Sequence, residues 1–418
     1  MGRSELGRRL LVVIVGACLV GVWMGEGWGG NAPPYAGSQV ISDIVLDWSS
    51  HKRLASGSDN WPVTWADDDH QYTAWGDGGG FGGTNKDGRL SLGVARIEGE
   101  GRSYRGFNVW GGKNQENPAT FDGKSYGILY LEGALYMWVS PGSGARNYNE
   151  ARLYKSADRG RSWTVAAWAF LKEDGMILPT FLQFGKAYQG ARDDFVYIYA
   201  NHWKKQHRPG SRDTLRVQKP GEIALMRVPQ KNIMDRSAYQ FFAGLDADGN
   251  PIWTSDLASR KAAFMDANGV GWNVSVSYNP GIARYLLTTE HTETNKGNLG
   301  TFDGPEPWGP WTTVAYISRF GFPWVEPTTF FWNFSNKWLS KDGKEFVLVF
   351  TGTRSNDSWN TVKGSFVVSR RSAGHGTGRK RGAYASLEGL GFQQGRSGIP
   401  TSGGSVLLRQ RSCAMAAW

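Results

Sequence analysis

Short apolar segments recur along the chain, and each is followed by a turn and a second apolar segment. The first segments fall at 72–75, 135–139, 195–200, 284–288 and 345–350, and the second at 92–97, 151–154, 222–228 and 364–368. Their near-alternating polarity and their β-branched and aromatic residues predict strands. The fourth unit has no clear second segment, and residues 304–311 in its place indicate a loop.

Five such units, spaced about 60–70 residues apart, are typical of a propeller, in which each blade is a small antiparallel sheet. The segment 156–163 also has the Ser-x-Asp-x-Gly-x-x-Trp pattern of an Asp-box, a turn found mainly in β-propellers. We therefore predict an all-β protein whose residues 40–371 form a five-bladed β-propeller.

The composition agrees with this prediction and adds a hint of ligand chemistry. The chain has 57 Gly, 20 Trp and only 20% charged residues. Glycine and aromatic residues suit short strands joined by tight turns. Aromatic faces also stack on sugar rings, although each single Trp is more often a core residue.

Both ends of the chain differ from the body. Arg8 and Arg9 precede an apolar run over residues 10–22, which predicts an export signal over residues 1–25. Cys18 ends a sequence similar to a lipobox, so a lipid anchor there and ordinary signal cleavage both stay open. Either predicts an exported protein: periplasmic, extracellular or an outer-surface lipoprotein. Residues 26–39 indicate a linker, and 372–418 a basic, disordered tail.

The net charge of +10 is concentrated near those ends, so the body lacks the basic stripe of a nucleic-acid binder. Only two cysteines occur, Cys18 and Cys413, so the body depends on its own core rather than on disulfides. No His or Cys spacing indicates a metal site, and we expect no cofactor, no nucleic-acid partner and a monomer.

Two aspartates of the first unit are candidate catalytic residues. Asp59 lies in a turn sequence before the first strands, and Asp77 follows the strand at 72–75. Loops at one end of a propeller's strands face one cavity, and glycosidic cleavage needs a protonated acid and a carboxylate. Asp beside Gly or Asn is more commonly a turn residue. The cluster 67–69 is interpreted as a solvated hairpin turn, with a Ca²⁺ site as the alternative.

Polar residues with aromatic neighbours recur at similar points of successive units. Sugar binding needs such pairs, because hydroxyls require directional partners and ring faces require stacking. The candidate substrate-binding residues are Trp61, Lys113, Asn114, Lys124, His202, Trp272, Asn273, Glu290, His291, Trp332 and Asn333.

These residues carry a family resemblance. The segments 59–62, 75–78, 112–114 and 332–334 resemble a bacterial family labelled as a domain of unknown function, DUF4185. Its members include endo-D-arabinanases of glycoside hydrolase family 183, which are five-bladed propellers. The resemblance implies that Asp59 and Asp77 serve as acid and base of an inverting reaction. Three glycines follow Asp77, where the resemblance leads us to expect a threonine. The resemblance therefore supports the assignment of the two acids more strongly than it supports the same substrate.

The leading hypothesis is a secreted glycoside hydrolase for a furanosidic, D-arabinan-like or related polysaccharide. The alternative is a non-catalytic glycan-binding or cell-surface propeller. A sialidase-like enzyme is the weakest interpretation, because no set of three arginines for a substrate carboxylate can be identified. If the first hypothesis holds, the two carboxyls should lie about 6.5–9.5 Å apart across one cavity.

Overall fold

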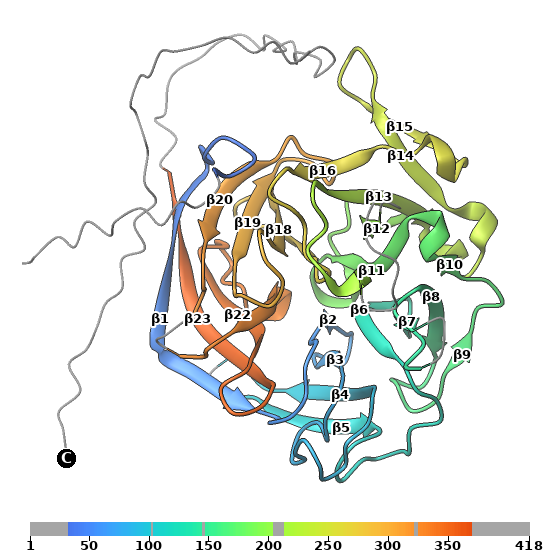
Figure 1. Cartoon of the computed structure of the whole chain (residues 1–418), viewed down its shortest axis with the longest axis vertical. Coiled ribbons are helices and arrows are strands. Elements are labelled where there is room, and N and C mark those ends of the chain that lie inside the picture. The colour runs from blue at the N-terminus through green and yellow to red at the C-terminus, as the bar shows by residue number, and fades with distance from the viewer. Residues whose placement is uncertain (1–31, 102, 144–146, 204–212, 322–324, 370–418) are drawn as a thin grey trace, which may run out of the picture. The chain divides into compact units, whose positions relative to one another are not determined.

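The computed structural model describes residues 32–101, 103–143, 147–203, 213–321 and 325–369. Within them the chain folds into strands β1–β23 and short 3-10 helices, arranged around a centre (Figure 1). The strands form four hydrogen-bonded sheets, of which the ten-stranded one comprises two of the five blades. The all-β, five-bladed β-propeller predicted from the sequence is confirmed. The signal segment, part of the linker and the tail lie outside the described residues and stay predictions.

Each blade is antiparallel, and its strands are ordered from the innermost to the outermost position. Blade 1 contains β2 (Val63–Trp65), β3 (Gln71–Trp75), β4 (Gly93–Glu98) and β5 (Arg105–Trp110). Blade 2 contains β6 (Lys124–Leu131), β7 (Ala134–Ser140), β8 (Glu150–Ser156), β9 (Thr164–Val165) and β10 (Phe170–Leu171).

Blades 3 and 4 are joined at their innermost strands, β11 and β17, which pair in parallel. Blade 3 contains β11 (Met176–Gln183), β12 (Phe195–His202), β13 (Gly221–Pro229), β14 (Gln240–Leu245), β15 (Pro251–Thr254) and β16 (Ala262–Asp266). Blade 4 contains β17 (Ser275–Asn279), β18 (Arg284–Glu290), β19 (Leu299–Gly304) and β20 (Thr312–Ile317).

Blade 5 is built from both ends of the described chain. It contains β21 (Thr329–Phe334), β22 (Glu345–Gly352) and β23 (Ser358–Val368), and its outermost strand is β1 (Ile41–Leu54). β1 pairs antiparallel with β23 from Ile41 opposite Val368 to Leu54 opposite Trp359. This pairing closes the ring, as the adjacent blue and red strands in Figure 1 show.

The 3-10 helices lie in the connections between strands. They are η1 (Lys172–Asp174), η2 (Lys186–Tyr188), η3 (Asp213–Leu215), η4 (Gln230–Asn232), η5 (Arg236–Ala238), η6 (Leu257–Ser259) and η7 (Asn336–Trp338). No helix of the described residues is long and apolar enough to cross a membrane.

The structure corrects the place of the predicted strands within each blade. The segments expected to come first are the second strands, β3, β7, β12, β18 and β22. The sequence pattern did not predict the innermost strands, although they are no more buried than the second strands: all residues of β6 and β21 are buried, and so are all residues of β3 and β7. The fourth blade also has its third strand, β19, which the interpretation of 304–311 as a replacing loop overlooked.

The predicted Asp-box forms the turn between β8 and β9. Asp158 accepts hydrogen bonds from the Ser156 hydroxyl at 2.7 Å and the Ser162 N–H at 2.9 Å. Trp163 donates from its indole N–H to the Gly160 carbonyl at 3.1 Å. The same turn carries Arg159, whose guanidinium pairs with Asp67 and Asp68 of blade 1, each at 2.8 Å.

The acidic cluster at 67–69 therefore links blades, and the interpretation as a plain solvated turn is incomplete. Asp69 pairs with Lys337 of η7 at 2.9 Å and with Lys186 of η2 at 3.2 Å. The hydrogen bond from Lys337 is the main reason that the pKa of Asp69 is lowered to about 2. With cations from blades 2, 3 and 5 around it, the hairpin between β2 and β3 joins several blades at one end of the ring.

Aromatic packing reinforces the seam between blades 1 and 5. Trp359 of β23 is fully buried, with its ring centroid 5.3 Å from that of Trp61 and 5.7 Å from that of Phe81. Its indole N–H donates to the Tyr104 hydroxyl at 2.8 Å. Residues from the first seventy positions of the propeller thus pack directly on its last strand.

We expect Trp359→Ala to lower the free energy of unfolding by about 3–5 kcal/mol, since it leaves a cavity at the seam and removes the indole hydrogen bond to the Tyr104 hydroxyl. Urea denaturation monitored by fluorescence and circular dichroism would measure this. Met265→Ala, at a side chain that is 52% exposed, is the control and should change stability by less than about 0.5 kcal/mol. A loss at Trp359 no larger than the control's would contradict this account of closure.

Candidate active site

A pocket of about 420 Å³ opens where the loops at one end of the blades converge. Blade 1 contributes Asp59 and Asp77, blade 2 contributes Lys124, and blade 5 contributes Asp357. The structure therefore brings the two predicted acids to one cavity from the same face of the propeller. Their roles in catalysis stay predictions.

The two turns that carry the acids are bonded directly to each other. The Asp59 N–H donates to the Gly76 carbonyl at 2.9 Å, and the Gly76 N–H donates back to the Asp59 carbonyl at 2.8 Å. A Cβ on Gly76 would lie 2.8 Å from Asp59 Oδ1 and 3.4 Å from Lys124 Nζ. Glycine at position 76 is thus what allows the carboxyl of Asp59 to lie against the turn of Asp77.

Lys124 supplies a positive charge from the first position of β6. Its side chain is only 5% exposed, and its ammonium pairs with Asp77 Oδ1. Arg89 also approaches Asp77 Oδ1, at 3.8 Å, and donates to the Asp77 carbonyl. Asp77 is therefore an ion-paired carboxylate whose side chain is still 40% exposed.

Asp59 has a different environment. It keeps some surface toward the pocket, but protein atoms enclose its carboxyl, which accepts a hydrogen bond from Asn60 Nδ2 at 3.0 Å. Burial raises the pKa of Asp59 to about 7, helped by the charges of Asp357 and Asp77 and opposed by Lys124. The site thus holds one carboxyl that keeps its proton near neutrality and one that is ion-paired.

The pocket is also lined by apolar and aromatic side chains. It is lined by Tyr126, Tyr148, Leu215, Trp272 and Phe330, with Asn295 beside them. Tyr126 and Trp272 pack edge to face with centroids 5.4 Å apart. Aromatic side chains and charged groups around one pocket are suited to a ligand with ring faces and hydroxyl edges.

Several predicted contact residues lie elsewhere. Trp61 and Trp332 are fully buried in hydrophobic clusters, so we correct their predicted role from substrate contact to core packing. Asn333 is buried and donates to the Trp61 carbonyl at 3.2 Å, which joins blade 5 to blade 1. Of the predicted substrate-binding residues, Lys124 and Trp272 line the pocket.

The remaining predicted contacts fall outside the residues that line the pocket. Lys113 pairs with Asp87 at 3.1 Å, and the neighbouring Asn114 has a φ of 52° in a turn. His202 Nδ1 lies 2.8 Å from Glu222. Lys113 and His202 thus have local charged partners, and none of these three residues lines the pocket.

Three further candidates are buried near the centre in blade 4. Asn273 is 1% exposed and has no described hydrogen-bond partner for its side chain. Glu290 accepts from the Lys296 N–H at 2.9 Å and so holds the loop that carries Asn295. His291 stacks on Tyr316 with centroids 3.6 Å apart. Glu290 therefore acts on the pocket through its loop rather than by lining it.

The glycines after Asp77 also have a role other than the close substrate approach expected of them. A Cβ on Gly79 would lie 2.1 Å from the Asp87 carbonyl oxygen and 2.9 Å from the Gly83 Cα. The glycine-rich loop is folded tightly on itself and fixes the turn that carries Asp77.

Sequence analysis missed Asp357, Leu215 and Asn295. Each lies in the loop between the second and third strands of its blade. His202 and Glu290, which the sequence did predict, are the last residues of second strands and begin two of these loops. The Ser-Asn-Asp-Ser stretch at 355–358 is a polar gap of that kind. If polar residues after the second strand are taken as candidates in all five blades, the pattern predicts Asp357.

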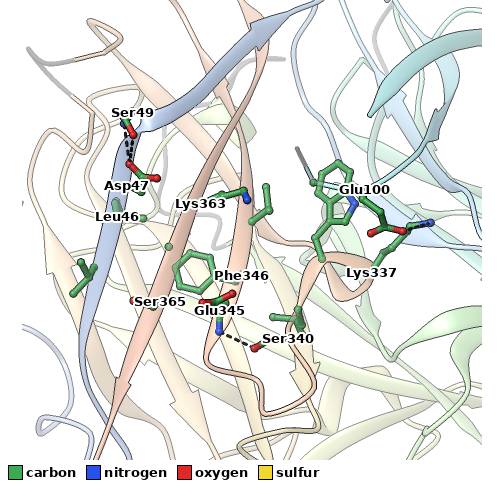
Figure 2. Close-up of a pocket in the computed structure, with 16 residues that line it drawn as sticks. Leu46, Asp47, Ser49, Glu100, Lys337, Ser340, Glu345, Phe346, Lys363 and Ser365 are labelled. Atoms are coloured by element: carbon green, nitrogen blue, oxygen red, sulfur yellow. Dashed lines mark hydrogen bonds and ion pairs between the residues drawn. The ribbon is translucent and has the colours of Figure 1, made fainter. Parts of the chain in front are cut away.

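A larger hollow of about 750 Å³ lies between blade 5 and the turn after β4 (Figure 2). Glu345 and Ser365, which line it, pair at the end of β22 and β23 remote from Asp357. Two of its charged groups have local partners: Lys337 lies 3.6 Å from Glu100, and Asp47 accepts from the Ser49 N–H at 3.1 Å. The smaller pocket with converging carboxyls is the better candidate.

The fold and the pocket define a five-bladed propeller with an acidic central site. The family model described as "Domain of unknown function (DUF4185)" matches residues 130–323. This confirms the predicted family resemblance over less than half of the chain, and the match does not reach Asp59, Asp77 or Asp357. No curated protein sequence matches this chain significantly.

Solved structures that resemble the chain include a GH43_1 enzyme from Xanthomonas citri, with 15% identity, a TM-score of 0.43, and coverage of 78% of this chain and 90% of that one. A Penicillium chrysogenum α-L-arabinanase solved with arabinobiose has 11% identity, a TM-score of 0.38, and coverage of 79% and 98%. At these identities and scores, no residue role or substrate is transferred from them.

The raised pKa of Asp59 predicts a pH-dependent cost in stability. Between its ordinary pKa of 3.8 and about 7, the native state holds a proton that the unfolded state releases, so stability falls as pH rises through this window. We expect Asp59→Asn to be more stable than wild type at pH 8, by on the order of 1–4 kcal/mol, and this difference to shrink toward pH 4. Urea unfolding at both pH values measures it. A difference that does not depend on pH would contradict the assigned environment of Asp59.

Proposed function

We propose that this protein is a glycoside hydrolase that cleaves a furanosidic, D-arabinan-like or related polysaccharide by two-carboxylate acid/base catalysis with inversion. The observation that carries the proposal is the pairing of Asp59, enclosed and protonated near neutrality, with Asp77, an ion-paired carboxylate at the same pocket. Glycosidic cleavage requires one group in each of these states. The resemblance of the segments around both aspartates to endo-D-arabinanases supports the substrate class.

The environments assign a role to each acid. Asp59 donates its proton to the glycosidic oxygen as the bond from that oxygen to the anomeric carbon breaks. Asp77 accepts a proton from a water molecule, whose oxygen forms the new bond to the anomeric carbon on the opposite face. The product sugar gains the hydroxyl and the leaving sugar gains the proton. Asp77 then releases its proton to solvent and Asp59 takes one up from solvent, which restores the starting state. Lys124 orients Asp77, and the wall containing Trp272 and Tyr126 supports the sugar ring.

The protein is further proposed to act outside the cytoplasm, as a monomer, without a cofactor. The basic start and apolar run of residues 1–25 support export, with Cys18 as the lipid attachment point if the lipobox is used. Fractionation of the producing cells, with mass spectrometry of the mature N-terminus, tests export. An intact N-terminus on cytosolic protein would contradict it.

The test of function is release of oligosaccharides from a panel of arabinans, xylans and other neutral polysaccharides by the purified chain. On the best substrate, Asp59→Asn and Asp77→Asn should each lower kcat by about 100-fold or more while sugar binding is largely kept. Asp87→Asn is the matched control, because Asp87 is an exposed aspartate on the neighbouring loop that pairs with Lys113 outside the pocket. It should keep activity within about twofold of wild type. Full activity in both site variants would overturn the assignment.

The first anomer released, observed by proton NMR, tests the stereochemistry. Inversion is expected if the carboxyl separation leaves room for a water molecule, and retention would instead require a covalent intermediate on Asp77. A non-catalytic glycan-binding propeller is the second candidate, favoured by the aromatic wall of the pocket. If the protein binds glycans but does not cleave them, and neither aspartate variant changes this, the binding function is identified.

A further inference from the structure

A third carboxyl faces the pocket from the last blade. Asp357 lies in the loop between β22 and β23 and lines the same cavity as Asp59 and Asp77. It comes from the opposite end of the propeller sequence, since its blade is closed by β1. Neither acid in the proposed reaction requires this residue, so its position calls for an explanation.

Backbone contacts hold this loop against the turn that carries Asp59. The Gly57 N–H donates to the Asp357 carbonyl at 2.5 Å, and the Asn60 N–H donates to the Thr351 hydroxyl at 3.1 Å. These bonds lie on the two sides of Asp59. The Asp59 turn is therefore fixed to blade 5 as firmly as to the Asp77 turn of its own blade.

Arg53 of β1 bonds to the same loop. Its guanidinium donates to the Asn356 carbonyl at 2.7 Å and pairs with Glu326 at 3.1 Å. Glu326 is buried and also accepts from the Arg354 N–H. The backbone on either side of Asp357 is thus anchored, which limits the positions open to its carboxyl.

The charges around Asp59 come from three blades. Asp77 and Arg89 face it from blade 1, Lys124 from blade 2 and Asp357 from blade 5. Lys124 and Arg89 both pair with Asp77, whereas no ion pair holds Asp357 within the described part of the chain. The two cations therefore compensate Asp77 first, and the charge of Asp357 acts on Asp59 with less compensation.

We propose that Asp357 is a positioning residue of the site: its carboxylate, held at the same pocket as Asp59 across the seam between blades 5 and 1, adds to burial in favouring the protonated form of Asp59. The consequence of this inference for catalysis rests on the proposed function. The effect of Asp357 on the protonation of Asp59 does not depend on it. Asp357 touches no reacting atom in the mechanism above. It acts through Asp59, and through the bonds that place both residues on one cavity.

Asp357→Asn removes the charge and keeps the shape, and its backbone bonds do not depend on the side chain. The carboxyl signal of Asp59, assigned by its loss in Asp59→Asn, should titrate about half a pH unit lower or more in Asp357→Asn than in wild type. Carbon-13 NMR of labelled aspartate in the full chain measures this. Asp357→Glu should restore the titration, and Asp248→Asn, at an exposed hairpin tip, should leave it unchanged.

On a confirmed substrate, the alkaline limb of kcat/KM should move to lower pH in Asp357→Asn. Activity should fall about threefold or more at pH 7.5 and stay within about twofold at pH 5, since the limb reports the acid in the free enzyme. A uniform loss at every pH would show a merely structural role and overturn the proposal. So would an unchanged Asp59 titration.

Two further outcomes keep the tests separate. If no polysaccharide is cleaved, the proposed function fails, but the NMR titration still decides the role of Asp357. If Asp357→Asn does not fold, the wild-type titrations decide it: coupled steps for Asp59 and Asp357 support the proposal, and independent single steps overturn it.

Discussion

The hydrogen-bonded pairing of β1 with β23 is the constraint on which the rest of the molecule depends. A propeller is a curved row of sheets, and without closure its first and last blades would expose unpaired edges and apolar seams. Here the strand that precedes blade 1 becomes the outer strand of blade 5. Trp359, Trp61 and Phe81 then fill the seam with aromatic contacts. Backbone hydrogen bonds and side-chain packing thus both close the ring.

The candidate site lies at this same seam. Asp59 and Asp77 precede and follow the short inner strands of blade 1, and Asp357 belongs to blade 5. Collecting three carboxyls in one place is unfavourable, because their charges repel and burial removes water. Burial and, to a lesser degree, this repulsion raise the pKa values of Asp59 and Asp357, and Lys124 and Arg89 offset part of the effect. The reactivity proposed for the site and its cost to stability have one electrostatic origin.

The sequence predicted the fold better than the site. Strands β3 and β7 were predicted from their apolar and aromatic residues although every residue in them is buried. The inner strands β6 and β21 are equally buried and were not predicted, so burial alone does not separate the two positions in a blade. Asp59 and Asp77 were found because they flank strands of a recognisable blade. Asp357 was not, because its proximity to them depends on ring closure between residues about 300 positions apart.

Aromatic residues show the same limit. Trp61, Trp272 and Trp332 all lie beside polar residues in the sequence, yet only Trp272 of the three lines the pocket. Trp332 lies within β21, whereas Trp61 and Trp272 lie in the connections before β2 and β17. Whether such a ring faces the pocket or the core depends on how its strand or connection is placed in the blade, and the neighbouring residues in the sequence do not encode that placement.

The direction of the closing strands has one practical result. Ile41 and Val368, the outer ends of β1 and β23, pair with each other at the end of blade 5 remote from Asp357. A lipid, a carrier domain or a solid support joined to either strand end would therefore hold the propeller by its underside. The carboxyl-lined mouth would remain turned toward the medium, where a polymer too large to diffuse could thread across it.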